Sequence, residues 1–380
     1  MPRIRDLGYQ IAISAFWGVR GARLNVGGIQ QYPASRDAYG NDILIEHSRD
    51  FFGGDPKGGI VIPLTDIWVL RPDVLKELRT AAWVPVDHDP CQPPTVDVMR
   101  EGNTLPIAMS RFGERMLKNE GFKPVYVPHG YDSSVFRPFD RMEARRALGL
   151  PEDAYIVGMV AANQGSRKSF PQAIRAFARF HRKHPDSVLY LHTWMGPESQ
   201  GVDLNKLAEQ ELGRRGKECL YVCDQYRYDT GLIDDAHLAN AYNALDLLMN
   251  PAQGEGFGVC IIESQACGTP VVLTNASAMP ELCGGGYLVD GTPVYTSFKS
   301  WQLLPDVDQL VEALEHHYAL GESERLAMRQ RALDFAGAYD ADRVTVEYWQ
   351  PALLEIADRL TPRRTPRKQG TAAVPGKRRR

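Results

Sequence analysis

Two glutamates, Glu255 and Glu263, stand eight positions apart in the stretch GEGFGVCIIESQACGTPVV, residues 254–272. Glu255 lies in a glycine-rich turn, and Glu263 lies in the apolar segment that follows it. The glycines allow the backbone to approach a ligand, and the N–H groups at a helix start can meet an anion or sugar oxygens. Carboxylates accept hydrogen bonds from sugar hydroxyls but repel phosphate. The spacing therefore predicts contacts to two separate hydroxyl-bearing groups of one extended ligand.

Two adjacent cations, Arg167 and Lys168, occur in ANQGSRKSF, directly after an apolar run. They supply a guanidinium fork and an ammonium, which suit a diphosphate. A nucleotide sugar combines two hydroxyl-bearing rings with a diphosphate between them. Each motif also has a structural interpretation, because an Arg-Lys pair often starts a solvated helix and an acid such as Glu263 is favoured in a first helical turn.

These residues need a scaffold, and the order of apolar runs predicts α/β architecture with a parallel sheet. In the first half, four short runs alternate with Gly/Pro-rich connections: YQIAISAFW, GGIVIPL, IWVLR and AAWVPVDHD. The stretch PIAMSRFGERMLKNEGFKPVYVPHG then predicts a strand, a helix that stops at Gly121, and another strand.

The same alternation of strands and helices restarts after YDSSVFRPFDRMEARRALGLPEDA, a Pro-rich and charged stretch that we interpret as a domain linker. The second half predicts strands in AYIVGMVAA, SVLYLHTW, LYVCD and TPVVLTN, and a helix whose face carries Phe170, Ile174, Phe177 and Phe180. We expect a first domain over 1–138, a second over 139–339, a terminal helical segment over 340–360 interrupted by Pro351, and a disordered basic tail over 361–380.

Composition indicates a globular, cytoplasmic protein. Apolar residues make up 43% of the chain and charged residues 24%, and no apolar run approaches the roughly 18–20 residues that cross a bilayer. The apolar start is interpreted as a strand and not as a signal peptide. Six scattered cysteines fit a reduced compartment, and the pair Cys219 and Cys223 has no second Cys/His pair at zinc-site spacing.

The charge is unevenly distributed. Residues 361–380 contain eight Lys/Arg and no acid, which leaves 36 basic against 47 acidic side chains in residues 1–360. The tail is a solubilising end on one interpretation, and an electrostatic contact for nucleic acid or an anionic surface on the other.

Four stretches together resemble retaining glycosyltransferases of family 4, enzymes with the GT-B fold: VPHGYDSSVFRP, AANQGSRKSFPQAIRAF, YNALDLLMNP and the opening GEGFGVCIIESQACGTPVV. The resemblance runs from about residue 105 to 290 in order. It implies two Rossmann-like doubly wound domains facing across a cleft, with the terminal segment 340–360 crossing back to the first domain.

The resemblance also implies residue roles. Arg167 and Lys168 would hold the donor diphosphate, Glu263 the ribose, and Glu255 the donor sugar. The other donor-binding residues implied are Asn163, Gly256, Phe257 and Gly258. In the first half, His88 in PVDHDP would face the donor sugar, and Gly27 and Gly28 in NVGGIQQY would approach the diphosphate and acceptor. The implied catalytic set is His88, Glu255, Arg167 and Lys168.

The expected reaction is metal-independent transfer of a hexose from a nucleotide-diphosphate sugar to a hydroxyl acceptor, with no cofactor. A UDP-sugar is the first expectation and GDP-mannose the second, with the base near CDQYRYD, residues 223–229. The acceptor would be a carbohydrate, a lipid-linked sugar or a small metabolite. No side chain is an obvious covalent nucleophile, since Cys91 near His88 is better explained as a packed thiol. This favours front-face substitution, in which the leaving phosphate takes the acceptor proton.

Three alternatives stay open. The enzyme could act on a hydroxylated base in DNA, with the basic tail as the contact. The chain could instead be a catalytically silent protein that binds nucleotide sugars or nucleic acid. A phosphorylase on the same fold would need a cofactor lysine, for which no motif is present.

Overall fold

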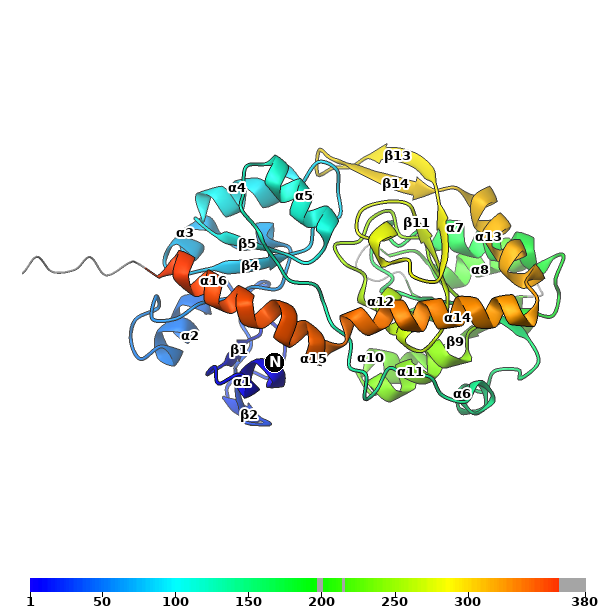
Figure 1. Ribbon diagram of the computed structural model, residues 1–380, viewed down its shortest axis with the longest axis horizontal. Helices are drawn as coiled ribbons and strands as arrows, with labels where there is room; N and C mark the ends of the chain where they lie inside the picture. Colours follow the sequence, from blue (N-terminus) through cyan, green and yellow to red (C-terminus); the bar gives the residue numbers. More distant parts are fainter. Residues whose placement is uncertain (197–200, 214–215, 362–380) are drawn as a thin grey trace, which may run out of the picture.

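The computed structural model describes residues 1–196, 201–213 and 216–361. The basic tail predicted over 361–380 thus lies, beyond Thr361, outside the described residues. No helix in the described part of the chain has the length and apolar character needed to cross a bilayer. Two lobes lie side by side, and the chain crosses between them twice (Figure 1).

The second half is built on a six-stranded sheet in which every pairing is parallel. Its strand order is β12-β11-β10-β7-β8-β9, which is the doubly wound order 3-2-1-4-5-6. The strands are β7 Tyr155–Val160, β8 Ser187–His192, β9 Leu220–Val222, β10 Leu247–Asn250, β11 Val271–Thr274 and β12 Gly286–Val289.

Helices cover both faces of this sheet, which explains why its strands are apolar without alternation. Ile156 of β7 packs with helices α11 and α12 on one face, and Val157 packs with α7 and α13 on the other. The face of α7 predicted from the sequence is confirmed, because its four apolar side chains are buried. The helices of this half are α6 Arg141–Leu148, α7 Phe170–His181, α8 Leu204–Leu212, α9 Gly216–Cys219, α10 Gln225–Asp229, α11 Asp235–Ala244, α12 Val259–Ala266, η3 Pro280–Leu282, α13 Val307–Ala319 and α14 Glu322–Ala336.

The linker prediction was too long. Residues 141–148 form helix α6, which packs on α11 of the second half, and Arg145 of α6 donates a hydrogen bond to the carbonyl oxygen of Ala244. The side chain of Asp140 caps this helix by accepting from the N–H of Glu143 at 2.9 Å. Charge and proline therefore marked a helix start and not an extended connection.

The first half contains two small sheets instead of the single one expected. Strands β4, β5 and β6 are parallel neighbours, and β1, β3 and β2 form a second sheet. The elements of this half are α1 Pro2–Asp6, β1 Ala12–Ser14, β2 Leu24–Val26, β3 Ile29–Tyr32, α2 Leu44–Phe51, η1 Ile67–Val69, α3 Pro72–Lys76, β4 Ala81–Val84, α4 Pro93–Glu101, β5 Leu105–Ala108, α5 Arg111–Asn119 and β6 Val125–Tyr126.

Two strand predictions in the first half were wrong. GGIVIPL makes only isolated parallel bridges to the β4 region, at Val61 and Leu64, because Pro63 between them has no N–H to donate. IWVLR forms the short 3-10 helix η1 instead of a strand.

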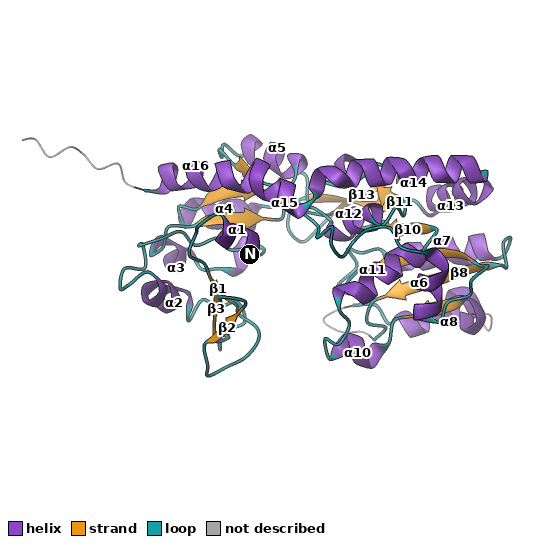
Figure 2. Cartoon of the chain, turned by 60° about the horizontal axis from the view of Figure 1, so that its bottom comes forward, coloured by secondary structure: helices purple, strands orange, loops and turns teal. Residues whose placement is uncertain are grey.

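A helical segment leads from the second half back to the first, as Figures 1 and 2 both show. It runs from α14 through η4 Gly337–Tyr339, α15 Ala341–Val344 and the π-helical turn η5 Thr345–Trp349 to α16 Gln350–Leu360. Ala352 and Ile356 of α16 pack against Ile107 of β5 and Val125 of β6. Pro351 does not interrupt the segment, since it lies in the first turn of α16, where a missing N–H is tolerated. An antiparallel hairpin, β13 Gly291–Tyr295 and β14 Trp301–Pro305, reaches toward the first half from the other side.

Candidate functional site

The topology of the large sheet gathers the predicted cations and one glutamate at a single place. Strands β7 and β10 are adjacent, but the chain leaves them toward opposite sides of the sheet, which makes their carboxyl ends a topological switch point. Arg167 and Lys168 follow β7 and precede α7, and Glu255 lies between β10 and α12. Ligands of doubly wound proteins bind in the crevice at such a point.

An ion-pair cluster occupies this edge. The ammonium of Lys168 donates to one carboxylate oxygen of Glu255, and Nη1 of Arg167 lies 3.1 Å from the other. The same Nη1 donates to the carbonyl oxygen of Gly254 at 2.8 Å. Burial of Glu255 acts to raise its pKa, but Lys168 and Arg167 outweigh this effect and the pKa is lowered. Glu255 is therefore an ionised, fixed carboxylate beside two cations.

The first half contributes a histidine and an aspartate to the same cluster. His88 follows β4, is buried, and its Nδ1 lies 2.6 Å from Oδ1 of Asp87. Oδ2 of Asp87 lies 3.7 Å from Nη1 of Arg167, which links the two halves. Because a carboxylate can only accept, Nδ1 of His88 donates to it, and in the tautomer with this proton on Nδ1 the other nitrogen, Nε2, is an acceptor. That buried Nε2 has no hydrogen-bond partner among the described residues, as expected for an atom whose partner is a ligand.

The two halves meet directly around this cluster, and this contact explains the glycines better than the predicted ligand approach does. A Cβ on Gly254 would lie 2.2 Å from the carbonyl oxygen of Asp87, and one on Gly256 would lie 2.5 Å from Cβ of Pro85. Backbone N–H groups of Asp89 and Trp301 also exchange hydrogen bonds with each other's carbonyl oxygens, at 3.1 and 3.0 Å. Only glycine fits at 254 and 256 with the halves in this arrangement.

Phe257 and Gly258 complete the turn. The Phe257 ring is buried and packs against His129 of the first half, with ring centroids 5.2 Å apart. Gly258 is the N-cap of α12 with φ +101°, a conformation that other residues rarely adopt. Both residues hold the turn in place. The donor contact predicted for them would therefore be made by their backbone groups.

Glu263 lies apart from the cluster, as its separate predicted role requires. It is in α12 and accepts a hydrogen bond from the Tyr242 hydroxyl of α11 at 2.9 Å. Burial raises its pKa to about 7, against the lowering effect of the Tyr242 hydrogen bond. Glu263 is therefore poised between its acid and carboxylate forms at neutral pH.

The Asn163 side chain is fully engaged within the protein. Its Nδ2 donates to the carbonyl oxygens of Trp194, Gly196 and Val202, and its Oδ1 accepts from the N–H of Val202 at 3.0 Å. These bonds hold the loop that follows β8. Asn163 thus supports the carboxyl edge of the sheet, and a direct donor contact by its amide would have to replace one of them.

Gly27 and Gly28 are not brought to the cluster. They form the turn between β2 and β3, both with positive φ, which is typical of a two-residue hairpin turn. The turn is held by Arg5, which donates to the Gly27 carbonyl oxygen, and by Asn25, whose side chain accepts from the Gly28 N–H at 2.9 Å. All of these partners belong to the first half.

The cysteines form no disulfide among the described residues. Burial, with smaller contributions from the carboxylates of Glu120 and Asp87, raises the pKa of Cys91 to about 12. A thiol with this pKa is a poor nucleophile at neutral pH, which supports its interpretation as a packed side chain. The described residues also contain no group of three or more His, Cys, Asp and Glu side chains that could hold a metal ion.

Sequence reasoning missed two residues that organise the site. Asp87 had no predicted role, although it contacts both His88 and Arg167. Ser277 accepts a hydrogen bond from the N–H of Glu255 at 2.8 Å and has φ +51°. The flanking acid in PVDHDP could have pointed to Asp87, whereas no signal in the sequence marks Ser277.

Comparison with known proteins agrees with this geometry. The family model described as glycosyl transferases group 1 matches residues 154–318, which include Arg167, Lys168 and Glu255 of the cluster but not Asp87 or His88. This part of the chain is therefore similar to that glycosyltransferase family.

Named relatives are similar over less than half of the chain. A D-inositol 3-phosphate glycosyltransferase of Stackebrandtia nassauensis is 33% identical over 171 residues, which are 43% of this chain and 36% of the relative. One of Acidothermus cellulolyticus is 35% identical over 170 residues, with the same two shares. The match therefore spans little more than a third of the length of these relatives.

Solved structures extend the similarity in fold to both halves of the chain. Sucrose-phosphate synthase from Thermosynechococcus elongatus superposes with a TM-score of 0.69 at 17% identity, covering 94% of this chain and 91% of the other. HepE of Anabaena, in complex with UDP and glucose, gives a TM-score of 0.61 at 17% identity over 83% and 81% of the two chains. The fold is GT-B, and the prediction of that fold is confirmed.

Proposed function

We propose that this protein is a retaining glycosyltransferase that moves a hexose from a nucleotide-diphosphate sugar to a hydroxyl acceptor, with a UDP-sugar as the favoured donor. The observation that carries the proposal is the cluster at the switch point. It sets Arg167, Lys168 and Glu255 of one half against the His88–Asp87 pair of the other.

Each part of the cluster has a task in this reaction. Arg167 and Lys168 each donate one hydrogen bond to Glu255. Their remaining N–H groups can hold the diphosphate and stabilise its negative charge as it leaves. The acceptor nitrogen Nε2 of His88 can receive a hydrogen bond from a donor-sugar hydroxyl. The carboxylate of Glu255 can orient another hydroxyl of that ring.

The reaction we propose retains configuration through front-face substitution. The acceptor oxygen forms its bond to the anomeric carbon as the bond to the diphosphate oxygen breaks, and the leaving phosphate takes the acceptor proton. The proposal assigns no covalent nucleophile and no metal ion. Detection of a glycosyl group attached to any side chain would contradict this mechanism.

The donor preference has support from one structural relative. HepE, whose fold is similar, has been solved with UDP and glucose. GDP-mannose remains the second candidate donor. The names of the sequence relatives include D-inositol 3-phosphate, which carries hydroxyl groups. This agrees with a hydroxyl acceptor but does not define the class of the acceptor. The alternative in which the tail contacts DNA concerns residues outside the described part of the chain and stays a prediction.

Melting temperature tests the donor proposal, because a ligand that binds the native state stabilises it by RT ln(1 + [L]/Kd). We expect a shift with UDP and UDP-glucose that is larger than with GDP and GDP-mannose. The shift should disappear in Arg167→Gln and persist in Arg175→Gln, an exposed arginine of the same half that pairs with Glu211. No shift with either nucleotide class would overturn the proposal.

Slow hydrolysis of UDP-glucose, followed by NMR, tests retention of configuration. The α-anomer of glucose should be released first; initial release of the β-anomer would contradict retention.

A further inference from the structure

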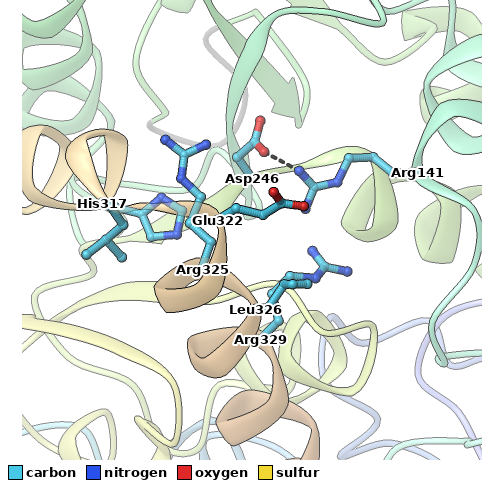
Figure 3. A pocket seen from close by; sticks show the side chains of 8 residues that line it. Arg141, Asp246, His317, Glu322, Arg325, Leu326 and Arg329 are labelled. Carbon is cyan, nitrogen blue, oxygen red and sulfur yellow. Dashed lines mark hydrogen bonds and ion pairs between the residues drawn. The ribbon is translucent and has the colours of Figure 1, made fainter.

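A cavity of about 560 Å³ lies at the opposite edge of the large sheet from the candidate site. Asp246 stands immediately before β10, and Arg141 lies at the start of α6, so this is the amino-terminal edge. The remaining lining residues come from the end of α13, the start of α14 and the turn between them (Figure 3). They are His317, Leu320, Glu322, Arg325, Leu326 and Arg329.

The carboxylate in the wall of this cavity already has its partners. Asp246 accepts hydrogen bonds from Arg141, from Arg145 at 2.8 Å and from the N–H of Ile156 at 2.8 Å. It is buried together with Arg145. Asp246 therefore already pairs with two guanidinium groups, those of Arg141 and Arg145.

Arg325 and Arg329 carry N–H groups that nothing in the described chain satisfies. Nε of Arg325 and Nη1 of Arg329 are buried without a hydrogen-bond partner among the described residues. Arg325 also donates to the carbonyl oxygen of Tyr318, which fixes its guanidinium at the cavity wall. In Figure 3 the side chains of Arg325 and Arg329 extend from the same helix into the space beside Arg141 and Asp246.

The local charge is positive at neutral pH. Burial, with a smaller contribution from the neighbouring Arg141, lowers the pKa of Arg329 to about 10, so the side chain stays a cation at neutral pH. Burial also lowers the pKa of His317 to about 4, and its Nδ1 is paired with the Tyr155 hydroxyl at 2.6 Å, so the ring is neutral. Glu322 is the other acid of the lining and is exposed. Three lining arginines thus face two carboxylates, one of them in solvent.

We propose that this cavity is a second ligand site, in which Arg325 and Arg329 bind a small anion that carries a phosphate group. Buried guanidinium N–H groups without acceptors are costly, and phosphate oxygens suit their geometry. Pockets for small molecules commonly measure 300–1,000 Å³, so the cavity has room for a phosphate ester as well as the free ion. Leu320 and Leu326 provide an apolar wall for the body of such an ester.

Calorimetric titration of the full chain tests this site, with inorganic phosphate and glucose 6-phosphate as probes and chloride at matched ionic strength as the blank. We expect saturable binding of phosphate that weakens at least tenfold in Arg325→Gln and in Arg329→Gln. Arg331→Gln is the matched control, because Arg331 is exposed on the same helix and does not line the cavity. Tighter binding of glucose 6-phosphate would identify an ester as the ligand, and equal binding would identify the free ion.

A second titration separates this site from the cleft. Phosphate binding should persist in Arg167→Gln; if it is lost there and kept in Arg329→Gln, phosphate binds only in the cleft and the proposal fails. Absence of saturable binding by either probe also overturns it. In phosphate-free buffer, Arg329→Gln should melt at the same temperature as the parent protein or higher, because an unpaired buried cation is removed. A clear fall in its melting temperature would indicate a purely structural role.

Discussion

The two edges of the large sheet bury arginines in opposite ways. At the carboxyl edge, Arg167 and Lys168 are paired with Glu255 and Asp87, and the first half of the chain covers them. At the amino edge, Asp246 is shared by Arg141 and Arg145, and buried N–H groups of Arg325 and Arg329 are left without acceptors among the described residues. One edge is balanced in charge and the other is not.

This difference separates two ways of preparing a binding site. In the cleft, Glu255 fixes two cations before any ligand arrives, so a diphosphate meets preorganised donors with little rearrangement. At the amino edge the cations are held by packing and by one carbonyl contact, and an anion would supply the missing acceptors. The positions of the cations in the cleft should therefore depend on its carboxylates. In the amino-edge cavity, the unpaired N–H groups should depend on a bound ligand for their acceptors.

The largest effect is expected from Arg167→Gln. The substitution removes a charge that contacts Glu255 and Asp87 and, in our proposal, the leaving diphosphate. Loss of one such preorganised donor typically reduces turnover about 10²–10³-fold. Steady-state kinetics with UDP-glucose should show this loss, while Arg175→Gln should keep the parent rate. Equal rates for both variants would remove the cleft cluster from the mechanism.

A smaller effect is expected from Gly254→Ala, which tests whether the first half must cover the carboxyl edge closely. The new Cβ would lie 2.2 Å from the carbonyl oxygen of Asp87, a backbone atom that cannot move aside alone. Overpacking of this kind costs about 1–3 kcal/mol. We expect a lower free energy of unfolding and weaker donor binding. Gly337→Ala is the control, since a Cβ there meets nothing within 4 Å and its φ is −55°. Unchanged stability and binding in Gly254→Ala would show that the halves are not held in this contact.

Glu263→Gln should change the pH dependence of the free energy of unfolding and of donor binding more than it changes the affinity for the donor. The pKa of Glu263 is raised to about 7, above its ordinary value of 4.5, so its protonated form contributes stability below about pH 4.5 that is lost as the pH rises through 7. Because the side chain is partly exposed, we expect only about 1–2 kcal/mol of this effect. The variant should lack that decline in the free energy of unfolding between pH 5 and 8.

Donor binding should respond with the opposite sign. The role predicted for Glu263 is to accept hydrogen bonds from ribose hydroxyls as an ionised carboxylate, so affinity for UDP-glucose should rise between pH 6 and 8, by about tenfold at most. Glu263→Gln should show a flat profile in the same titrations. A parallel rise in the variant would assign the pH dependence to another group.

The second half was largely predictable because its signals are local. Runs such as AYIVGMVAA and TPVVLTN are buried on both faces, so apolar content alone marks them as strands of a covered parallel sheet. Helix α12 ends at Ala266, shortly before Gly268, whose φ of +78° suits a glycine after a helix end. In the first half the runs are shorter and partly exposed. Pro63 stands within its run and was a visible sign against a strand, whereas no signal within IWVLR marks the 3-10 turn at Ile67.

The site was predictable as a set of residues but not as a set of contacts. Arg167, Lys168 and Glu255 could be named because each follows a strand with a recognisable pattern. Their ion pairs, and the link from Arg167 to Asp87, join positions about 80 residues apart and depend on the strand order. The amino-edge cavity was not predicted at all. Its arginines are spaced like ordinary solvated helix residues, and only packing shows that their N–H groups are buried.

The most direct test of the account is calorimetric titration of UDP-glucose into the parent protein, Arg167→Gln and Arg329→Gln. The two variants each remove one arginine of the second half, at opposite edges of the same sheet. We predict that UDP-glucose binds the parent protein and Arg329→Gln alike and no longer binds Arg167→Gln. Binding that is kept in Arg167→Gln and lost in Arg329→Gln would place the donor at the amino edge and contradict the account.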